Sequence, residues 1–234
     1  MKQPKVIFLD AVGTLFGVKG SVGEVYSYLA SQVGVNCDAS LLETLFYQQF
    51  KKAPPLAFPK VDVMEVSDLE YQWWYQVAYD TYKEAKVIDK FRDFDSFFQQ
   101  LYDYFASPHP WFLYDDVFPA LQYWQKQSIA LGIISNFDSR IYEVLDIFGL
   151  TSFFQTITIS STTGIAKPNS DIFIEALEKH NCQPEETWHI GDSKKEDYQG
   201  AKSAGINAFL LQRNEKIDRS DYTIIDSMER LISN

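Results

Sequence analysis

The chain of 234 residues is long enough for one large domain or for a core that carries a smaller second domain. Hydrophobic residues make up 46% of it and aromatic residues 16%, which is typical of a globular protein with a packed core. Its 21 basic and 32 acidic residues give a formal charge of −11, which argues against nucleic acid and membrane partners. Because a chain this acidic does not attract an anionic substrate over long distances, a phosphate must be attracted by groups at the site itself, with the help of a metal ion.

The first predicted element is a strand at Val6–Leu9, a continuous apolar run that ends at Asp10. Such a run is typical of a strand that is buried on both faces, as in a parallel sheet. A carboxylate at a strand end can attack phosphorus or carbon and give a covalent intermediate that water later hydrolyses. Gly13 then lets the backbone approach the transferred group, and the Thr14 hydroxyl can donate a hydrogen bond to it.

The same N-terminal stretch holds only four apolar residues in a row, too few for a signal peptide or a membrane span. The two cysteines, Cys37 and Cys182, are far apart, and no pattern around them indicates a zinc site. Reduced thiols are the simpler interpretation. We therefore expect a cytoplasmic protein. As separate expectations, the protein is monomeric or dimeric and acts on a small molecule.

Residues 16–110 are rich in aromatic side chains and have the patterns of helices. Three capping boxes predict helix starts, at Ser21 with Glu24, Ser40 with Glu43, and Ser67 with Glu70. Pro54-Pro55 and Phe58-Pro59 predict a break in the middle. We expect residues 16–110 to form a helical cap, and residues 1–15 and 111–234 to form an α/β core.

Three further apolar runs predict strands after this insertion, at Ala130–Ile134, Trp188–Ile190 and Ala208–Leu211. Helical patterns flank them at 115–127, 138–148, 170–180 and 194–204. The alternation predicts an α/β fold with a doubly wound, Rossmann-like parallel sheet, which binds ligands at the carboxyl ends of its strands. Asp10, Ser135 and Asp192 all follow or close predicted strands.

The polar residues near these strand ends can act together on a phosphorylated substrate. Ser135 and Asn136 can bind an anionic oxygen, and the Lys167 ammonium can neutralise charge on the nucleophile and on a phosphoryl group. Asp192 can join Asp10 in holding Mg²⁺, a hard cation that prefers carboxylate and water oxygens. The order of these residues along the chain makes the pattern far more specific than any one of them.

Four segments resemble the four motifs of the haloacid dehalogenase (HAD) superfamily. They are VIFLDAVGTLF, IISNFD, GIAKPNSDIF and HIGDSKKEDYQGAKSAG. The resemblance spans the whole predicted core, and the insertion after the first motif is similar to the helical type I cap of that superfamily. Phe58-Pro59 followed by Trp73-Trp74 is similar to the cap of its rhythmically-expressed-gene-2-like branch.

This resemblance implies a role for each motif residue. It implies that the two catalytic residues are the nucleophile Asp10 and the third-motif lysine, Lys167. The transferred group is expected to be bound by Thr14, Ser135 and Asn136. The resemblance further implies that Mg²⁺ is held by Asp10, the Val12 backbone carbonyl and Asp192, with support from Gly13 and Asp197.

Val12 departs from the phosphatase pattern. Phosphatases of the superfamily carry a second aspartate there, which protonates the leaving group and then activates water. Valine can do neither, and the loss of a positioned general acid–base costs about 10²–10⁴ in rate. A phosphoester with a good leaving group needs less acid assistance. The sequence therefore predicts weak Mg²⁺-dependent phosphatase activity on a small, activated phosphoester.

Two alternatives remain open. Dehalogenases of the superfamily also lack the second aspartate, because halide needs no proton to leave, so a 2-haloacid dehalogenase is one of them. Those enzymes use a cap arginine, whereas this chain has no arginine before Arg92, and they lack the metal carboxylate that Asp192 supplies here. The other alternative is a catalytically impaired binding or regulatory protein with the HAD fold. Receiver domains lack the helical insertion, and neither a P-loop nor a dinucleotide-binding motif occurs.

Overall fold

The computed structural model of the protein describes residues 3–213 and 222–232. These residues divide into two compact units. One lies within Met1–Gly17, Ala57–Lys60 and Leu113–Asn234, and the other comprises Val18–Leu56 and Val61–Phe112. In the part of the chain that is described, no helix has both the length and the apolar character needed to cross a membrane.

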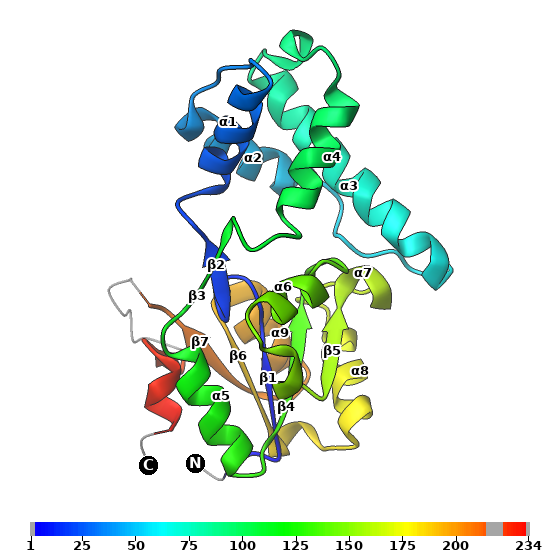
Figure 1. Ribbon diagram of the computed structural model, residues 1–234. Coiled ribbons are helices and arrows are strands. Elements are labelled where there is room, and N and C mark those ends of the chain that lie inside the picture. Colours follow the sequence, from blue (N-terminus) through cyan, green and yellow to red (C-terminus); the bar gives the residue numbers. More distant parts are fainter. Residues whose placement is uncertain (1–2, 214–221, 233–234) are drawn as a thin grey trace. The chain divides into compact units, whose positions relative to one another are not determined.

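A six-stranded parallel sheet forms the centre of the first unit (Figure 1). Its strands are β1 (Val6–Leu9), β4 (Ala130–Ser135), β5 (Thr156–Ile159), β6 (Thr187–Gly191), β7 (Asn207–Leu211) and β8 (Ile224–Ile225). The order β5-β4-β1-β6-β7-β8 shows that the chain moves outward from β1 in both directions, which makes the sheet doubly wound. All four residues of β1 are buried, which explains its unbroken apolar run. The predicted Rossmann-like α/β fold is confirmed.

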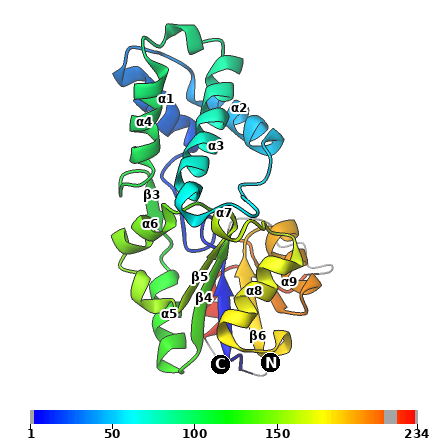
Figure 2. The same cartoon turned by 90° about the vertical axis from the view of Figure 1, so that its right-hand side faces the viewer.

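Helices cover both faces of this sheet. Figure 2 shows α5 (Val117–Lys126) and α6 (Ile141–Ile147) on one face, and α8 (Ser170–His180) and α9 (Gly200–Ser203) on the other. Phe8 of β1 and Phe173 of α8 belong to one buried apolar cluster, which joins the sheet to its second helical face. The remaining helical segments of this unit are α7 (Ser160–Thr163), η2 (Thr151–Phe153), η3 (Pro184–Glu186), η4 (Lys194–Gln199) and η5 (Met228–Leu231).

Among the elements of the core that differ from the prediction are one strand and two helices. Strand β5 was missed because its sequence alternates threonine with isoleucine, as suits an edge strand, and lacks a continuous apolar run. The helix predicted at 138–148 begins only at Ile141, because the Asp138 carboxylate accepts hydrogen bonds from the Arg140 backbone and side chain in the preceding turn. The helix predicted at 194–204 starts as the π-helical segment η4 and becomes α-helical at Gly200.

Four helices form the second unit. They are α1 (Val22–Gln32), α2 (Ala39–Lys52), α3 (Val63–Glu84) and α4 (Phe94–Tyr104), with the short η1 (Ile88–Lys90). Tyr82 is fully buried, stacks on Tyr26 with 5.6 Å between ring centroids, and donates a hydrogen bond to the Tyr26 carbonyl at 2.9 Å. Aromatic packing therefore supplies the core of this unit.

One of the three predicted capping boxes marks a helix start. Ser21 accepts a hydrogen bond from the Glu24 backbone and is the N-cap of α1. The predictions at Ser40 and Ser67 are wrong, because Asp38 and Asp62 cap α2 and α3 at earlier positions. An aspartate caps a helix as well as a serine does, so the first suitable side chain before the helical run takes the role.

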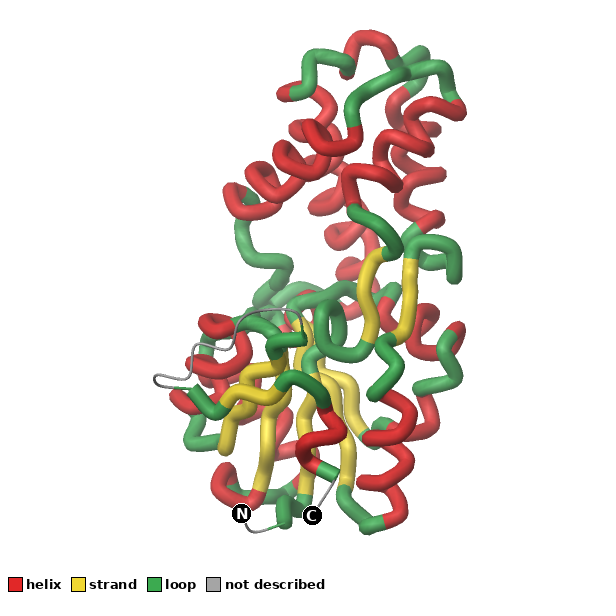
Figure 3. Tube along the Cα trace, turned by 90° about the vertical axis from the view of Figure 1, so that its left-hand side faces the viewer, coloured by secondary structure: helices red, strands yellow, loops and turns green. Residues whose placement is uncertain are grey.

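The segments that join the two units pair with each other. Strands β2 (Phe16–Val18) and β3 (Trp111–Leu113) form a two-stranded sheet of their own (Figure 3). The chain thus passes from the first unit into the second along β2 and returns along β3, and Ala57–Lys60 in between also belongs to the first unit.

Candidate active site

Three adjacent strands bring Asp10, Ser135 and Asp192 to one edge of the sheet. Asp10 follows β1, Ser135 closes β4 and Asp192 follows β6. In a parallel sheet these carboxyl ends share one edge, where open α/β sheets bind their ligands. The Ser135 hydroxyl donates a hydrogen bond to Oδ1 of Asp10 at 3.1 Å. Asp10 itself is 7% exposed, so its carboxylate lies in a largely enclosed environment.

Lys167 is a buried cation that joins two carboxylates. Its Nζ lies 2.7 Å from Oδ1 of Asp10 and 2.6 Å from Oδ1 of Asp197, and donates to the Ile134 carbonyl at 2.9 Å. Three acceptors match the three protons of an ammonium group. Burial by itself lowers the pKa of Lys167, but the charges of Asp10 and Asp197 outweigh it and the pKa is raised. Lys167 therefore carries its charge at neutral pH.

The pKa values of the two carboxyl partners move in opposite directions. Burial raises the pKa of Asp10 above its ordinary value, against the opposing charge of Lys167. Burial also acts to raise the pKa of Asp197, but Lys167 and His189 outweigh it and hold that pKa well below its usual range. Asp197 is therefore the firmly ionised counter-ion of Lys167.

Asn136 holds the backbone of Lys167 in place. Its Nδ2 donates to the Lys167 carbonyl at 2.9 Å, and the Lys167 N–H donates to its Oδ1 at 2.7 Å. Because one side-chain amide is hydrogen-bonded to both the N–H and the carbonyl of Lys167, it fixes the position of that residue. The sequence assigned Asn136 to the substrate and contained no sign of this structural task, because the two residues are far apart in the chain.

Asp197 is held by donors on both oxygens. Besides Lys167, His189 places Nε2 at 2.9 Å from Oδ1, and the Ser193 N–H donates to Oδ2 at 3.0 Å. A Cβ atom at Gly191 would lie 2.1 Å from Cγ of Asp197, so only glycine leaves room for this carboxylate. Asp197 thus positions Lys167, and the fully buried His189 has the structural role that its place inside a strand indicates.

Three carboxylates meet at this edge of the sheet. Asp10, Asp192 and Asp197 each offer an oxygen atom, and these atoms lie within 4.8 Å of one another. Asp192 is exposed on one side, but partial loss of surrounding water, followed by the charges of Asp10 and Asp197, raises its pKa to about 7. Carboxylate oxygens are ligands that suit a hard divalent cation, and a cation would relieve their repulsion. The donor set therefore fits Mg²⁺.

The turn after Asp10 is closed by its own backbone. The Ala11 carbonyl accepts hydrogen bonds from Thr14, Leu15 and Phe16, at 3.2, 2.7 and 3.2 Å. Half-buried Val12 lies within this turn. Thr14 is fully buried, and its hydroxyl has no hydrogen-bond partner among the residues that the structure describes. The expected bond from Thr14 to the transferred group therefore stays a prediction.

Gly13 is the one position in this turn where the backbone requires glycine. Its φ of +87° lies in the left-handed region, and a Cβ atom there would lie 2.3 Å from Oδ2 of Asp192. We expect Gly13→Ala to lower the free energy of unfolding by about 1–3 kcal/mol. It should also weaken Mg²⁺ binding, because Asp192 must move. Urea unfolding and titration calorimetry measure the two effects.

Gly34→Ala is the matched control for Gly13→Ala. Gly34 has a similar φ of +82°, but a Cβ atom there would have no neighbour within 4 Å. This control should lose stability from backbone strain alone and bind Mg²⁺ as the wild type does. Equal Mg²⁺ affinities of the Gly13 variant and the wild type would contradict the steric role of Gly13.

Lys167→Met should lower the free energy of unfolding by about 3–5 kcal/mol, because Asp10 and Asp197 would lose their shared buried cation. Lys179→Met is the control. Lys179 pairs with Glu175 at 2.8 Å, but both side chains are 35% exposed, so its loss should cost less than about 1 kcal/mol. Chemical denaturation compares the two, and equal losses would show that the Lys167 pairs add no special stability.

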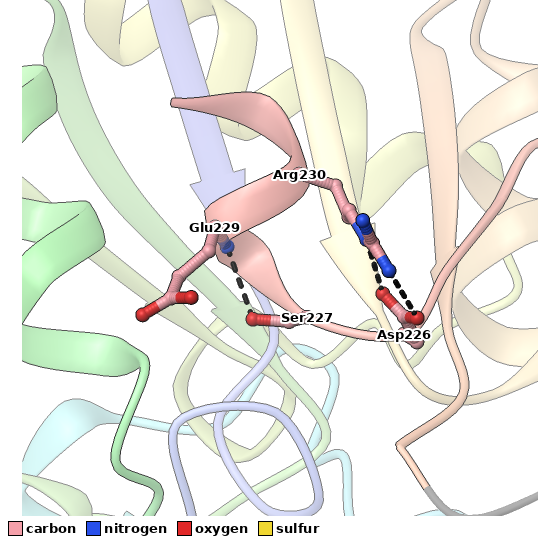
Figure 4. Close-up of a pocket in the computed structure, with 4 residues that line it drawn as sticks. All are labelled: Asp226, Ser227, Glu229 and Arg230. Carbon is pink, nitrogen blue, oxygen red and sulfur yellow. Dashed lines mark hydrogen bonds and ion pairs between the residues drawn. The ribbon is translucent and has the colours of Figure 1, made fainter. Parts of the chain in front are cut away.

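A separate surface pocket lies on the C-terminal segment and includes none of these residues. It is lined by Asp226, Ser227, Glu229 and Arg230 (Figure 4). Arg230 donates to the two oxygens of Asp226 at 2.8 and 2.9 Å, so the charges that line the pocket largely satisfy each other. The candidate catalytic residues therefore lie at the edge of the sheet and not in this pocket.

Comparisons with known proteins agree with the motif pattern. The sequence profile of the haloacid dehalogenase-like hydrolases matches residues 4–205. Haloacid dehalogenase-like hydrolase domain-containing protein 3 of Bos taurus is 31% identical over 216 residues, which cover 92% of this chain and 85% of the relative. The Rhythmically expressed gene 2 protein of Drosophila melanogaster is 26% identical over 215 residues, which cover 88% and 82%.

Solved structures share the fold across nearly the whole chain. The magnesium-bound structure of YfnB from Bacillus subtilis superposes with a TM-score of 0.74 at 20% identity. The superposition covers 98% of this chain and 97% of the YfnB chain. Phosphatase and dehalogenase structures both occur among the similar folds. At such identities the fold is shared, and the choice between the two chemistries depends on the residues of the site.

Proposed function

The chain belongs to the haloacid dehalogenase-like hydrolase family, in the branch of the Rhythmically expressed gene 2 protein, and on this basis we propose that it is a weak Mg²⁺-dependent phosphatase. The observation that carries the proposal is the contact of Lys167 with Asp10, beside a second carboxylate at Asp192. A phosphoryl-transfer site needs a nucleophile, a fixed cation and a place for a metal. These residues can supply all three.

We assign the metal to Asp10, Asp192 and the Val12 backbone carbonyl. Asp197 already accepts hydrogen bonds from Lys167 and the Ser193 backbone, so its task is to orient Lys167. Once bound, Mg²⁺ would supply positive charge against the phosphoryl oxygens.

Asp10 carries the covalent step in this proposal. Its carboxylate attacks phosphorus, the bond from phosphorus to the leaving oxygen breaks, and that oxygen departs with the electron pair. Water then attacks phosphorus and breaks its bond to Asp10, which releases inorganic phosphate and restores the carboxylate. Lys167 stabilises negative charge in both steps, and Ser135 orients Asp10 through its hydrogen bond. We assign substrate oxygens to Thr14, Ser135 and Asn136, whose Nδ2 carries a second N–H besides the one that bonds the Lys167 carbonyl.

Substrate selection falls to the helical insertion. We propose that residues 16–110 act as the cap and that residues 1–15 and 111–234 are the catalytic core. Val12 restricts the substrate further, because it cannot donate a proton to a poor leaving group. A small aryl or acyl phosphate, whose leaving group departs as a stable anion, therefore fits the site better than an alkyl phosphate.

The experiment that tests this proposal is a panel of phosphoesters and 2-haloacids, each assayed with Mg²⁺ and with a chelator. We expect phosphate release from an aryl phosphate that requires Mg²⁺, and no halide release. Halide release that the chelator leaves unchanged would instead support the dehalogenase that Val12 also permits. Mg²⁺ binding without turnover of any substrate would favour the binding or regulatory protein.

A further inference from the structure

Arg213 lies just beyond the carboxyl end of β7, on the same edge of the sheet as the carboxylates. Its Nη2 donates to the Thr14 carbonyl at 2.8 Å, and its Nη1 lies 2.6 Å from Oδ2 of Asp116. The guanidinium carbon lies 4.1 Å from the centre of the Tyr114 ring. One side chain therefore joins the turn after β1, the segment before α5 and the end of β7.

Asp116 is the anchor of Arg213. It is 7% exposed, and its Oδ2 also accepts hydrogen bonds from the Ser227 hydroxyl at 2.9 Å and the Met228 N–H at 2.8 Å. Burial acts to raise the pKa of Asp116, but the hydrogen bonds from Arg213 and Met228 outweigh it and the pKa is lowered. The carboxylate therefore stays charged and keeps Arg213 in place.

The Thr14 carbonyl belongs to a fully buried residue two positions after Val12. A charged donor forms a stronger hydrogen bond than a neutral one, and a buried carbonyl that loses its donor is costly. The same turn includes Gly13, whose backbone is fitted against Asp192, and its hydrogen bonds converge on Ala11. A displacement at Thr14 is therefore transmitted to both Val12 and Gly13.

We infer that Arg213 is a positioning residue for the candidate site: its guanidinium fixes the turn at residues 11–16, which includes the Val12 carbonyl that we assign to the metal. The part of this inference that concerns the metal rests on the proposed function. Arginine suits the task because its planar fork reaches two acceptors while one face stacks on an aromatic ring. A lysine retains the charge but supplies neither the fork nor the stacking face.

Arg213→Lys, made in the full chain, tests this inference. We expect faster hydrogen exchange of the backbone amides at residues 13–16, measured by mass spectrometry. Titration with Mg²⁺ should give a dissociation constant that is about 10–100-fold higher, as for other residues that orient metal ligands. A residue with a merely structural role would lower the free energy of unfolding and leave the Mg²⁺ affinity of the folded protein unchanged.

Arg230→Lys is the matched control, since Arg230 also bonds both oxygens of an aspartate but is 68% exposed in its side chain. It should change neither measurement. If Arg213→Lys does not fold, Ser227→Ala removes one hydrogen bond from Asp116, keeps Arg213, and should accelerate exchange at residues 13–16 to a smaller extent.

The two proposals fail in different ways. Unchanged exchange at residues 13–16 in the variant that folds would overturn the role of Arg213, whether or not Mg²⁺ binds. If wild-type protein binds Mg²⁺ and Arg213→Lys binds it equally well, the link between Arg213 and the metal is overturned. Absence of Mg²⁺ binding to the wild type would instead contradict the proposed phosphatase, and the exchange measurement would still decide the role of Arg213.

Discussion

Replacement of Asp10 by asparagine is expected to lower Mg²⁺-dependent turnover of an aryl phosphate by at least about 10³-fold. The amide has no negative charge and cannot form the covalent intermediate that we propose. It also removes one of the carboxylates that are assigned to the metal. Phosphate release, followed continuously with saturating Mg²⁺, measures the loss.

The Asp10→Asn variant should remain folded, because Lys167 keeps Asp197 as its counter-ion. An unfolding midpoint close to that of the wild type would separate lost chemistry from lost structure. Asp226→Asn is the matched control, since Asp226 pairs with Arg230 on the surface and should retain full turnover. Wild-type turnover in the Asp10 variant would exclude this carboxylate as the nucleophile.

Val12→Asp is expected to increase turnover of alkyl phosphates by about 10²–10⁴. The new carboxyl group would lie two residues after Asp10, where it can protonate the leaving oxygen and later deprotonate water. Alkyl phosphates should gain in both steps, whereas aryl phosphates should gain only in the water-attack step, because their leaving groups depart without a proton. Steady-state rates on a matched alkyl and aryl pair measure this difference.

Val12→Asn separates proton transfer from a change in polarity. Asparagine has nearly the shape of aspartate, but its amide cannot act as a general acid or base near neutral pH. We expect it to give no gain on either substrate. Equal rates for the aspartate and asparagine variants would contradict the explanation that Val12 limits the enzyme through missing acid–base catalysis.

The strands near the centre of the sheet could be predicted because burial on both faces requires unbroken apolar runs, as in β1 and β4. The edge strand β5 is only partly buried and alternates threonine with isoleucine, so its sequence has no unbroken apolar run and did not predict a strand. Helix starts in the insertion were ambiguous, because Asp38 and Ser40 both fit a cap, and the first of them begins the helix.

The sequence predicts the position of a candidate site residue where that residue stands at the end of a strand. Asp10, Ser135 and Asp192 follow from the parallel sheet alone. The pairing of Asn136 with Lys167 depends on a loop path between distant segments, so it could not be read from either residue. Arg213 offered one sign that was missed, since it stands just beyond a predicted strand at the same sheet edge.

In the proposed reaction a phosphoryl group is transferred to Asp10, and chemical trapping of this aspartyl phosphate tests that step. Wild-type protein is mixed with an aryl phosphate and Mg²⁺, quenched in acid and reduced with borohydride, which converts an aspartyl phosphate to homoserine. Because Val12 leaves the water-attack step without a base, the intermediate should accumulate.

Mass spectrometry of the peptide that contains Asp10 should then show homoserine at position 10, and a chelator should abolish it. Phosphate release with an unmodified Asp10, or with the modification at another residue, would contradict the role of Asp10 as the nucleophile.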